Sequence, residues 1–180
     1  IQYENERMGL LVGQLLDLAR TENVTPQMEL IDFSRLIAGE ALPFESVAFE
    51  KGLILNSNIL NGITLEGNST QLKQLTSILL DNAVRHSNAN GEVCLTLKKE
   101  HGIVVFSVVN RGDEIPTEHR EQIFERFYRV DPARNGEDRH YGLGLAIAKA
   151  IVNAHHGHIE VLCYNGLVEF RVSLPIAKEK

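Results

Sequence analysis

The chain has 180 residues, of which 43% are hydrophobic and 23% are charged, with 14 Gly and 5 Pro. This balance is typical of a globular protein and excludes a disordered, collagen-like or wholly coiled-coil chain. The net charge of −6 argues against nucleic acid as a partner, which would need a basic face, and no apolar run reaches the roughly 20 residues that span a bilayer.

Residues 1–22 predict an amphipathic helix. Its apolar residues recur at the spacing of a helix that packs in a bundle, with Met8, Leu11, Leu15 and Leu18 in one stripe. Because no partner helix is near in the sequence, we expect this stripe to pack on another chain; folding back onto the rest of this chain is the alternative. Residues 23–27 predict a linker.

The middle of the chain predicts short strands and long helices. We expect a strand at 28–32 and then a helix to about Lys51, capped by Ser34 and kinked or broken at Pro43. The stretches LILNSN and ITLEGN flank Asn61-Gly62 and predict a β-hairpin. The next helix is expected from Asn68 or Ser69 to about His86.

The remainder predicts four more strands and two helices. Two alternating strands are joined by a turn at 100–102, followed by a short helix after Pro116, a polar stretch over 129–141, a helix after Gly142 and two closing strands. Helices segregated over a mixed, mostly antiparallel sheet predict an α+β fold, a two-layer sandwich preceded by one amphipathic helix. Cys94 and Cys163 lie in apolar runs and are interpreted as free thiols, although sequence alone leaves a disulfide open.

The helix at 69–86 carries the first candidate site. Asn82 falls at the edge of its apolar stripe, with Arg85 and His86 one turn further on the same side. A carboxamide oxygen suits Mg²⁺, and the guanidinium of Arg85 suits phosphates. A polar helix end that simply meets solvent is the alternative.

Two glycine-containing stretches add to this site. Asn110 ends a strand beside Gly112 and could read the edge of a ligand, or it could belong to a simple loop. Gly142 and Gly144 open a helix whose N-terminal N–H groups favour an anion, although no Walker A or dinucleotide motif is present. The polar stretch before them, which includes Arg129, is interpreted as a lid or, alternatively, as a disordered surface loop.

Taken in order, these stretches resemble the ATP-binding catalytic part of sensor histidine kinases of two-component systems. LLDNAVRHS (79–87) looks like the asparagine box and VVNRGDEIP (108–116) like the first glycine box of that family. IFERFYRVDPAR (123–134) resembles its phenylalanine box, and YGLGLAIAKAIVNAHHG (141–157) its second glycine box. ENERMGLLVGQLLDLARTEN (4–23) looks like the second helix of the dimerisation and phosphotransfer hairpin.

The resemblance implies a Bergerat ATP-binding fold over residues 28–177, with ATP and Mg²⁺ as ligands. Asn82 would bind the metal, Arg85 and His86 would lie on the phosphate and ribose side, and Asn110 would contact the adenine amine in a pocket shaped by Gly112. Arg129 would be a phosphate-contacting lid residue, anchored by Phe124, Phe127 and Tyr128. The glycine-box residues that would line the phosphates are Gly142, Leu143 and Gly144.

The chain departs from the family pattern at four positions. Asn110 replaces the usual Asp, and Glu114, Ile78 and His140 stand where the family often has Gly, Asn and Gly. None of the seven histidines has the sequence context of the family's phosphoacceptor. We therefore assign no catalytic residue in this chain and expect the acceptor histidine on an upstream helix absent from it.

The function implied is transfer of the ATP γ-phosphoryl group to that histidine, for relay to a response regulator. The implied partners are a second copy of the chain, through the N-terminal helix, and a receiver domain. The implied location is the cytoplasmic part of a membrane protein. A degenerate nucleotide-binding scaffold, a phosphatase-only relative and an ATPase of the wider superfamily are the alternatives.

Overall fold

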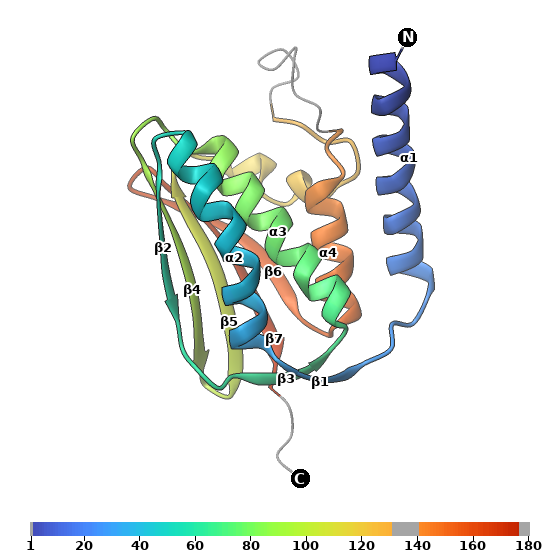
Figure 1. The fold of residues 1–180 in the computed structure, drawn as a ribbon, viewed down its shortest axis with the longest axis vertical. Helices are drawn as coiled ribbons and strands as arrows, with labels where there is room; N and C mark the ends of the chain where they lie inside the picture. Colours follow the sequence, from blue (N-terminus) through green and yellow to red (C-terminus); the bar gives the residue numbers. More distant parts are fainter. Residues whose placement is uncertain (1, 131–140, 177–180) are drawn as a thin grey trace.

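The computed structural model describes residues 2–130 and 141–176 as two layers, one of helices and one of strands (Figure 1). The helices α2 (Phe33–Glu50), α3 (Ser69–His86) and α4 (Gly144–Ala154) cover one face of a five-stranded sheet. Helix α1 (Gln2–Asn23) flanks α4 at the side of this layer. The predicted α+β sandwich with one preceding helix is confirmed.

The five-stranded sheet has the order β2-β4-β5-β7-β6. Its strands are β2 (Ile54–Ile59), β4 (Glu92–Glu100), β5 (Ile103–Arg111), β6 (His158–Tyr164) and β7 (Leu167–Pro175). Only the β2–β4 pair is parallel, so the sheet is mixed and mostly antiparallel, as predicted. Two short 3₁₀ helices, η1 (Thr117–His119) and η2 (Gln122–Phe124), connect β5 to the region before α4.

The predicted hairpin around Asn61-Gly62 is wrong. Gly62 does turn the chain, with a φ of 74°, but the strand before it pairs with β4 while β3 (Thr64–Gly67) pairs with β1 (Glu29–Asp32) in a separate two-stranded sheet. The start of α2 holds the turn instead: Ser34 Oγ donates to the Leu60 carbonyl at 2.6 Å and accepts from the Ile63 amide at 2.9 Å. The predicted turn is therefore present, but its two flanking strands pair with other strands.

Two details of α2 also differ from expectation. Asp32, not Ser34, is the N-cap, and its carboxylate accepts from the Arg35 amide at 3.0 Å. The helix continues through Pro43 without a break. Because Pro43 is exposed, water can hydrate the Gly39 carbonyl that loses its helical partner.

The core lies between the helical layer and the sheet. The Phe33 ring meets that of Phe106 edge-on, with 6.0 Å between centroids, and Phe124 meets Phe170 in the same way at 6.1 Å. Residues Val104–Val108 of β5 are buried without alternation because β5 lies in the middle of the sheet, between β4 and β7. These contacts fix the two layers against each other and hold the end of β5 opposite α3.

His155 joins the end of α4 to the beginning of α3. Its ring is buried; Nδ1 bonds to the Ile151 carbonyl at 2.7 Å and Nε2 accepts from the Asn68 amide at 3.0 Å. Burial is the main cause that lowers the pKa of His155 below its ordinary value of 6.5. The imidazole is therefore neutral where it ties the two helices together.

Helix α1 folds back onto its own chain, so its apolar stripe is divided. Leu18 is 2% exposed in the core and Leu11 packs against it, whereas Met8 is 63% exposed and Leu15 is 36% exposed. Gln74 of α3 donates to the Asp17 carboxylate at 3.2 Å, which anchors the same face. The expectation that the whole stripe serves a second chain is wrong for Leu11 and Leu18.

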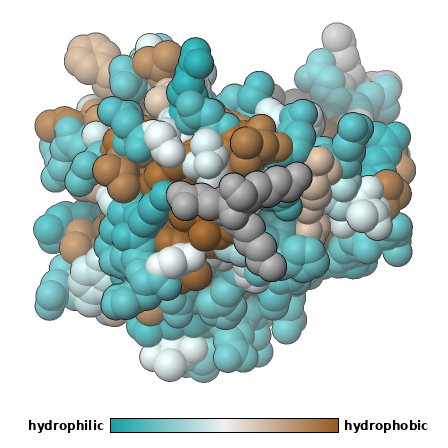
Figure 2. All heavy atoms as spheres, turned by 90° about the horizontal axis from the view of Figure 1, so that it is seen from below, coloured by the Kyte–Doolittle hydropathy of each residue, from teal (hydrophilic) through white to brown (hydrophobic). Residues whose placement is uncertain are grey.

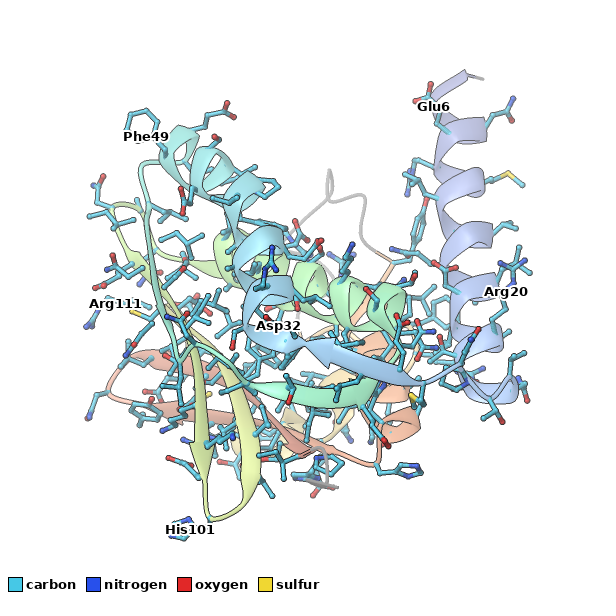
Figure 3. The ribbon with its side chains drawn as sticks, turned by 60° about the horizontal axis from the view of Figure 1, so that its bottom comes forward. Glu6, Arg20, Asp32, Phe49, His101 and Arg111 are labelled. Atoms are coloured by element: carbon cyan, nitrogen blue, oxygen red, sulfur yellow. The ribbon has the colours of Figure 1, made fainter. Side chains whose placement is uncertain are left out.

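Apolar side chains also reach the surface away from α1. The view from below shows brown apolar residues among hydrophilic ones (Figure 2), and Leu30 of β1, at this end of the molecule, is 68% exposed. Phe49 projects from the far end of α2 and is 82% exposed, while His101 marks the tip of the β4–β5 hairpin (Figure 3).

Cys94 and Cys163 are free thiols. Within residues 2–130 and 141–176, no helix combines the length and hydropathy needed to cross a membrane.

Candidate functional site

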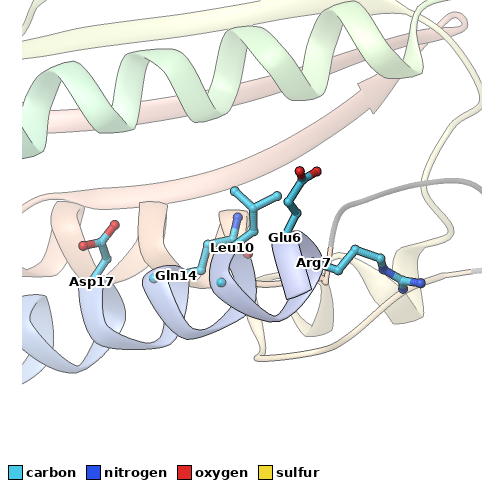
Figure 4. Close-up of a pocket in the computed structure, with 7 residues that line it drawn as sticks. Glu6, Arg7, Leu10, Gln14 and Asp17 are labelled. Atoms are coloured by element: carbon cyan, nitrogen blue, oxygen red, sulfur yellow. The ribbon is translucent and has the colours of Figure 1, made fainter. Parts of the chain in front are cut away.

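A cavity of about 490 Å³ opens between α3, the start of α4 and the C-terminal end of β5. It brings together seven of the nine residues predicted from the sequence: Asn82, Arg85, His86, Asn110, Arg129, Gly142 and Gly144. A second hollow of about 590 Å³ runs along α1, where Glu6, Leu10 and Asp17 point toward α3 (Figure 4). Gln14 borders both spaces.

Helix α3 supplies one wall of the cavity. It begins at the N-cap Asn68, whose side chain accepts from the Gln71 amide at 3.1 Å, and it presents Asn82, Arg85 and His86 near its C-terminal end. Arg85 Nη2 donates to the Asp81 carboxylate at 3.1 Å, one turn earlier. The wall thus offers a neutral amide beside a guanidinium that a carboxylate partly holds in place.

Asn110 is the penultimate residue of β5, lies at the floor of the cavity and is 1% exposed. Its Oδ1 atom is buried and has no hydrogen-bond partner among the described residues. Val168 lies opposite it in the β5–β7 register, and Phe170 belongs to the same wall. An unpaired acceptor on an apolar floor fits a flat ligand that carries an amino group, because a buried unsatisfied oxygen costs about 1–3 kcal/mol.

Gly112 does not line the cavity but lets α3 approach the loop after β5. A Cβ atom at this position would lie 2.5 Å from the His86 carbonyl oxygen and 3.0 Å from Asn110 Nδ2. The loop is fixed further along, where Glu114 accepts from the Gly166 amide at 2.8 Å. Gly112 therefore shapes the floor through the backbone.

The start of α4 forms the opposite end of the cavity. Gly142 has a φ of 71°, and a Cβ there would lie 3.0 Å from the Tyr128 carbonyl oxygen. Leu143 precedes α4, but its side chain is buried in the core, so only its backbone could serve a ligand. No side chain caps α4 among the described residues, which leaves the N–H groups of its first turn and the positive end of its dipole for an anion.

The segment before residue 131 carries the base of the predicted lid. Phe124 is buried against Phe170, Tyr128 lines the cavity, and the Tyr128 hydroxyl bonds to Nδ1 of His119. Phe127 is 56% exposed and has a φ of 61°, so its predicted role as an anchor is wrong. Its backbone amide donates to the Gly142 carbonyl at 3.0 Å. The rest of the predicted lid, with His140, lies outside the described residues.

Tyr141 and Gln14 are polar residues of the cavity that the sequence did not predict as site residues. Tyr141 lines the cavity, donates its hydroxyl to the Arg7 carbonyl at 2.8 Å and lies 5.9 Å beneath the Arg7 guanidinium. Gln14 reaches the cavity from α1. In the sequence, Gln14 lies between Leu11 and Leu18, two residues of α1 that pack on the domain. A polar residue on such a face is the one feature that could have indicated a functional role.

Comparison with known proteins bears on this site. Residues 67–178 match the family described as histidine kinase-, DNA gyrase B- and HSP90-like ATPase. The sensor protein DltS of Streptococcus agalactiae is 33% identical over 175 residues, which are 96% of this chain and 44% of DltS. The chain thus spans less than half the length of this curated relative.

Solved structures share the fold. The catalytic domain of the histidine kinase ThkA has a TM-score of 0.73 at 26% identity, covering 83% of this chain and 96% of that one. Full-length ShkA in complex with AMPPNP has a TM-score of 0.82 at 28% identity, covering 98% of this chain and 37% of ShkA. The latter match extends over nearly the whole chain.

Proposed function

The chain belongs to the histidine kinase-, DNA gyrase B- and HSP90-like ATPase family, and from this membership we propose that it is the ATP-binding catalytic part of a sensor histidine kinase. In this proposal residues 28–177 bind ATP, α1 is the second helix of the phosphotransfer hairpin and residues 23–27 are the linker. The γ-phosphoryl group passes to a histidine on a helix outside this chain. The relatives named as sensor proteins support this assignment.

The observation that carries the proposal is the unpaired Oδ1 atom of Asn110. It offers an acceptor to the adenine amine, while Val168 and Phe170 give the base an apolar surface. The uncapped start of α4 lies across the cavity and suits the phosphates. A ligand with an amino-bearing ring at one end and phosphates at the other fits both ends at once.

The polar side chains of α3 and of the segment before residue 131 fit Mg²⁺ as well as phosphate. The Asn82 side chain brings a neutral oxygen of the kind that Mg²⁺ accepts, and Arg85 and Arg129 bring positive charge to the same cavity. When bound, Mg²⁺ would neutralise phosphate charge. The protein's own part is to hold the nucleotide in line with its acceptor, because phosphoryl transfer depends on positioning and charge rather than on covalent catalysis.

The partners and location are part of the same proposal. ThkA is known in complex with the response regulator protein TrrA, which supports a receiver domain as the final acceptor. A second copy of the chain would join through the outward face of α1. Since the chain spans less than half of DltS, we further propose that a membrane anchor and sensor belong to other parts of the protein.

A degenerate or ATPase role is less well supported by the site. Glu114 lines the cavity, but its carboxylate accepts from the Gly166 amide at 2.8 Å and is thereby held in the loop after β5. Asp81, the carboxylate next to Asn82, is engaged by Arg85 at 3.1 Å and so is a poor candidate for the general base that an ATPase needs. Neither residue therefore favours one of these roles over the kinase reaction.

The test uses radiolabelled ATP with and without a separate phosphotransfer hairpin that carries the family's histidine. The chain alone should gain no acid-labile phosphate, whereas the added hairpin should be labelled slowly in trans. The same hairpin with its histidine replaced by glutamine is the control. Efficient labelling of the chain's own histidines, or ATP hydrolysis that ignores the hairpin, would overturn the proposal.

A further inference from the structure

Helix α1 contributes one amide to the cavity, although it lies outside the segment that matches the ATPase family. Gln14 lines the cavity, and its Oε1 atom is buried without a hydrogen-bond partner among the described residues. An unpaired buried acceptor costs about 1–3 kcal/mol, so native proteins rarely keep one without a use. Asn110 Oδ1 is the other cavity atom of this kind on a carboxamide.

The contacts of α1 locate Gln14 along the cavity. Helices α1 and α3 run in opposite directions, and Asp17 is bonded to Gln74 (Figure 1). One turn further on each helix are Gln14 on α1 and Ser77 and Ile78 on α3, and all three residues line the cavity. Ile78 packs beside the first residue of α4, since a Cβ on Gly144 would lie 3.6 Å from Ile78 Cγ2.

We infer that Gln14 lies at the α4 end of the cavity, because α1 packs on α4 and Ile78 lies beside Gly144. The N–H groups of the first turn of α4 attract anions at this end, whereas the apolar floor beside Asn110 suits a base. A carboxamide has two donors for phosphate oxygens and an oxygen that Mg²⁺ accepts. In bound ATP, the group nearest to the Gln14 carboxamide would be the γ-phosphate.

We propose that Gln14 contacts the γ-phosphate end of bound ATP and thereby makes the docking of α1 depend on whether that phosphate is present. The inference rests on the proposed nucleotide site. Because coupling between two binding events is reciprocal, a nucleotide that gains affinity from docked α1 must also favour the docked helix. ADP lacks the γ-phosphate, so it leaves α1 freer to undock.

Calorimetry on the full chain tests the contact. Gln14→Leu should weaken binding of a non-hydrolysable ATP analogue with Mg²⁺ by about tenfold, the effect of one lost charge-assisted hydrogen bond, and that of Mg·ADP by less than about twofold. Gln71→Leu is the matched control, because Gln71 also buries an unpaired Oε1 but does not line the cavity. It should change neither affinity.

The possible results separate the two proposals. Equal losses for both nucleotides would place Gln14 at the sugar or base, and no loss for either would remove it from the site; both would overturn the inference. If the wild-type chain bound neither nucleotide, the proposed function itself would fail. Should Gln14→Leu not fold, Gln14→Glu keeps the side-chain length, and its charge should weaken the metal-free ATP analogue more than metal-free ADP.

Hydrogen exchange of the α1 amides tests the coupling directly. In the wild type, the ATP analogue should protect these amides more than ADP does, and Gln14→Leu should abolish that difference while Gln71→Leu retains it. Equal protection of α1 by the two nucleotides in the wild-type chain would refute a docking equilibrium that depends on the γ-phosphate.

Discussion

In the proposed nucleotide site, Asn110 has a carboxamide where the family usually has a carboxylate. A carboxylate only accepts hydrogen bonds, so it pairs with the adenine amine and repels the carbonyl that guanine has at that position. A carboxamide can rotate and offer either an acceptor or a donor. Because Asn110 is only 1% exposed, a mispaired carboxamide would weaken the binding free energy of the nucleotide.

We expect Asn110→Asp to raise the preference for ATP over GTP by about tenfold or more, because a mispaired buried group costs about 1–3 kcal/mol. Competition of both nucleotides against a fluorescent ATP analogue measures this ratio. Asn58→Asp, on the exposed strand β2, controls for the added charge. An unchanged ratio would mean that Asn110 does not touch the base.

Asn82 provides a second test at this scale. Asn82→Ala removes the amide oxygen proposed for Mg²⁺, so it should weaken Mg·ATP binding by about tenfold while barely changing metal-free binding. Asn88→Ala, just beyond α3 and exposed, is the control. Calorimetry that finds the same loss with and without Mg²⁺ would contradict a role in metal binding.

His155 predicts a pH dependence of stability. Its folded pKa lies below the ordinary 6.5, so the unfolded chain takes up a proton first as the pH falls, and stability decreases from about pH 7 down toward the folded pKa. His155→Leu should lose about 1–3 kcal/mol at pH 7.5, since the Asn68 amide is left unpaired, but should show a shallower loss toward pH 5.5.

Urea unfolding at the two pH values measures both effects. The exposed His158 of β6 is the control, and His158→Gln should keep the wild-type slope. A His155→Leu variant whose stability falls as steeply as the wild type's would assign the acid sensitivity to other groups.

At the scale of single residues, the motifs predicted seven of the residues that line the cavity. Asn82 and Asn110 were found because they stand at the ends of regular elements within ordered motifs. Leu143 shared such a motif, yet its side chain turns into the core. Gln14 belongs to α1, which packs on residues that are distant along the chain. A local sequence pattern therefore could not show that Gln14 reaches the cavity.

At the scale of elements, the sequence predicted the helices and strands better than their pairing. Asn61-Gly62 turns the chain as its residues require, but the hydrogen bonds of Ser34 and the parallel pairing with β4 take the two flanking strands into different sheets. Such partners are distant along the chain. Local turn chemistry therefore could not reveal them.

Helix α1 now has two faces with different expected roles. Met8→Glu combined with Leu15→Glu should leave the unfolding free energy nearly unchanged and abolish any self-association, because both side chains face outward. Leu18→Ala should instead cost about 2–5 kcal/mol, as it removes a fully packed core side chain. Sedimentation and urea unfolding separate these effects; persistent association of the double variant would place the contact elsewhere.

At the scale of the whole molecule, nucleotide binding should stabilise the fold. At a concentration 100 times the Kd, a ligand adds about 2.7 kcal/mol, which for a chain of this size corresponds to a Tm increase of roughly 5–10 °C. Chelating Mg²⁺ should remove much of this increase in the wild type but little of it in Asn82→Ala. A Tm indifferent to nucleotide would contradict the proposed site.

The short connection between α1 and β1 limits how far the helix can travel. It comprises residues 24–28, which reach about 17 Å when fully extended. An undocked α1 thus stays at a millimolar effective concentration near its own cavity, whatever the amount of protein in solution. A second chain must compete with this tether for Leu11 and Leu18, but it meets no such competition for Met8 and Leu15. Dilution should therefore separate two chains without freeing α1 from its own domain.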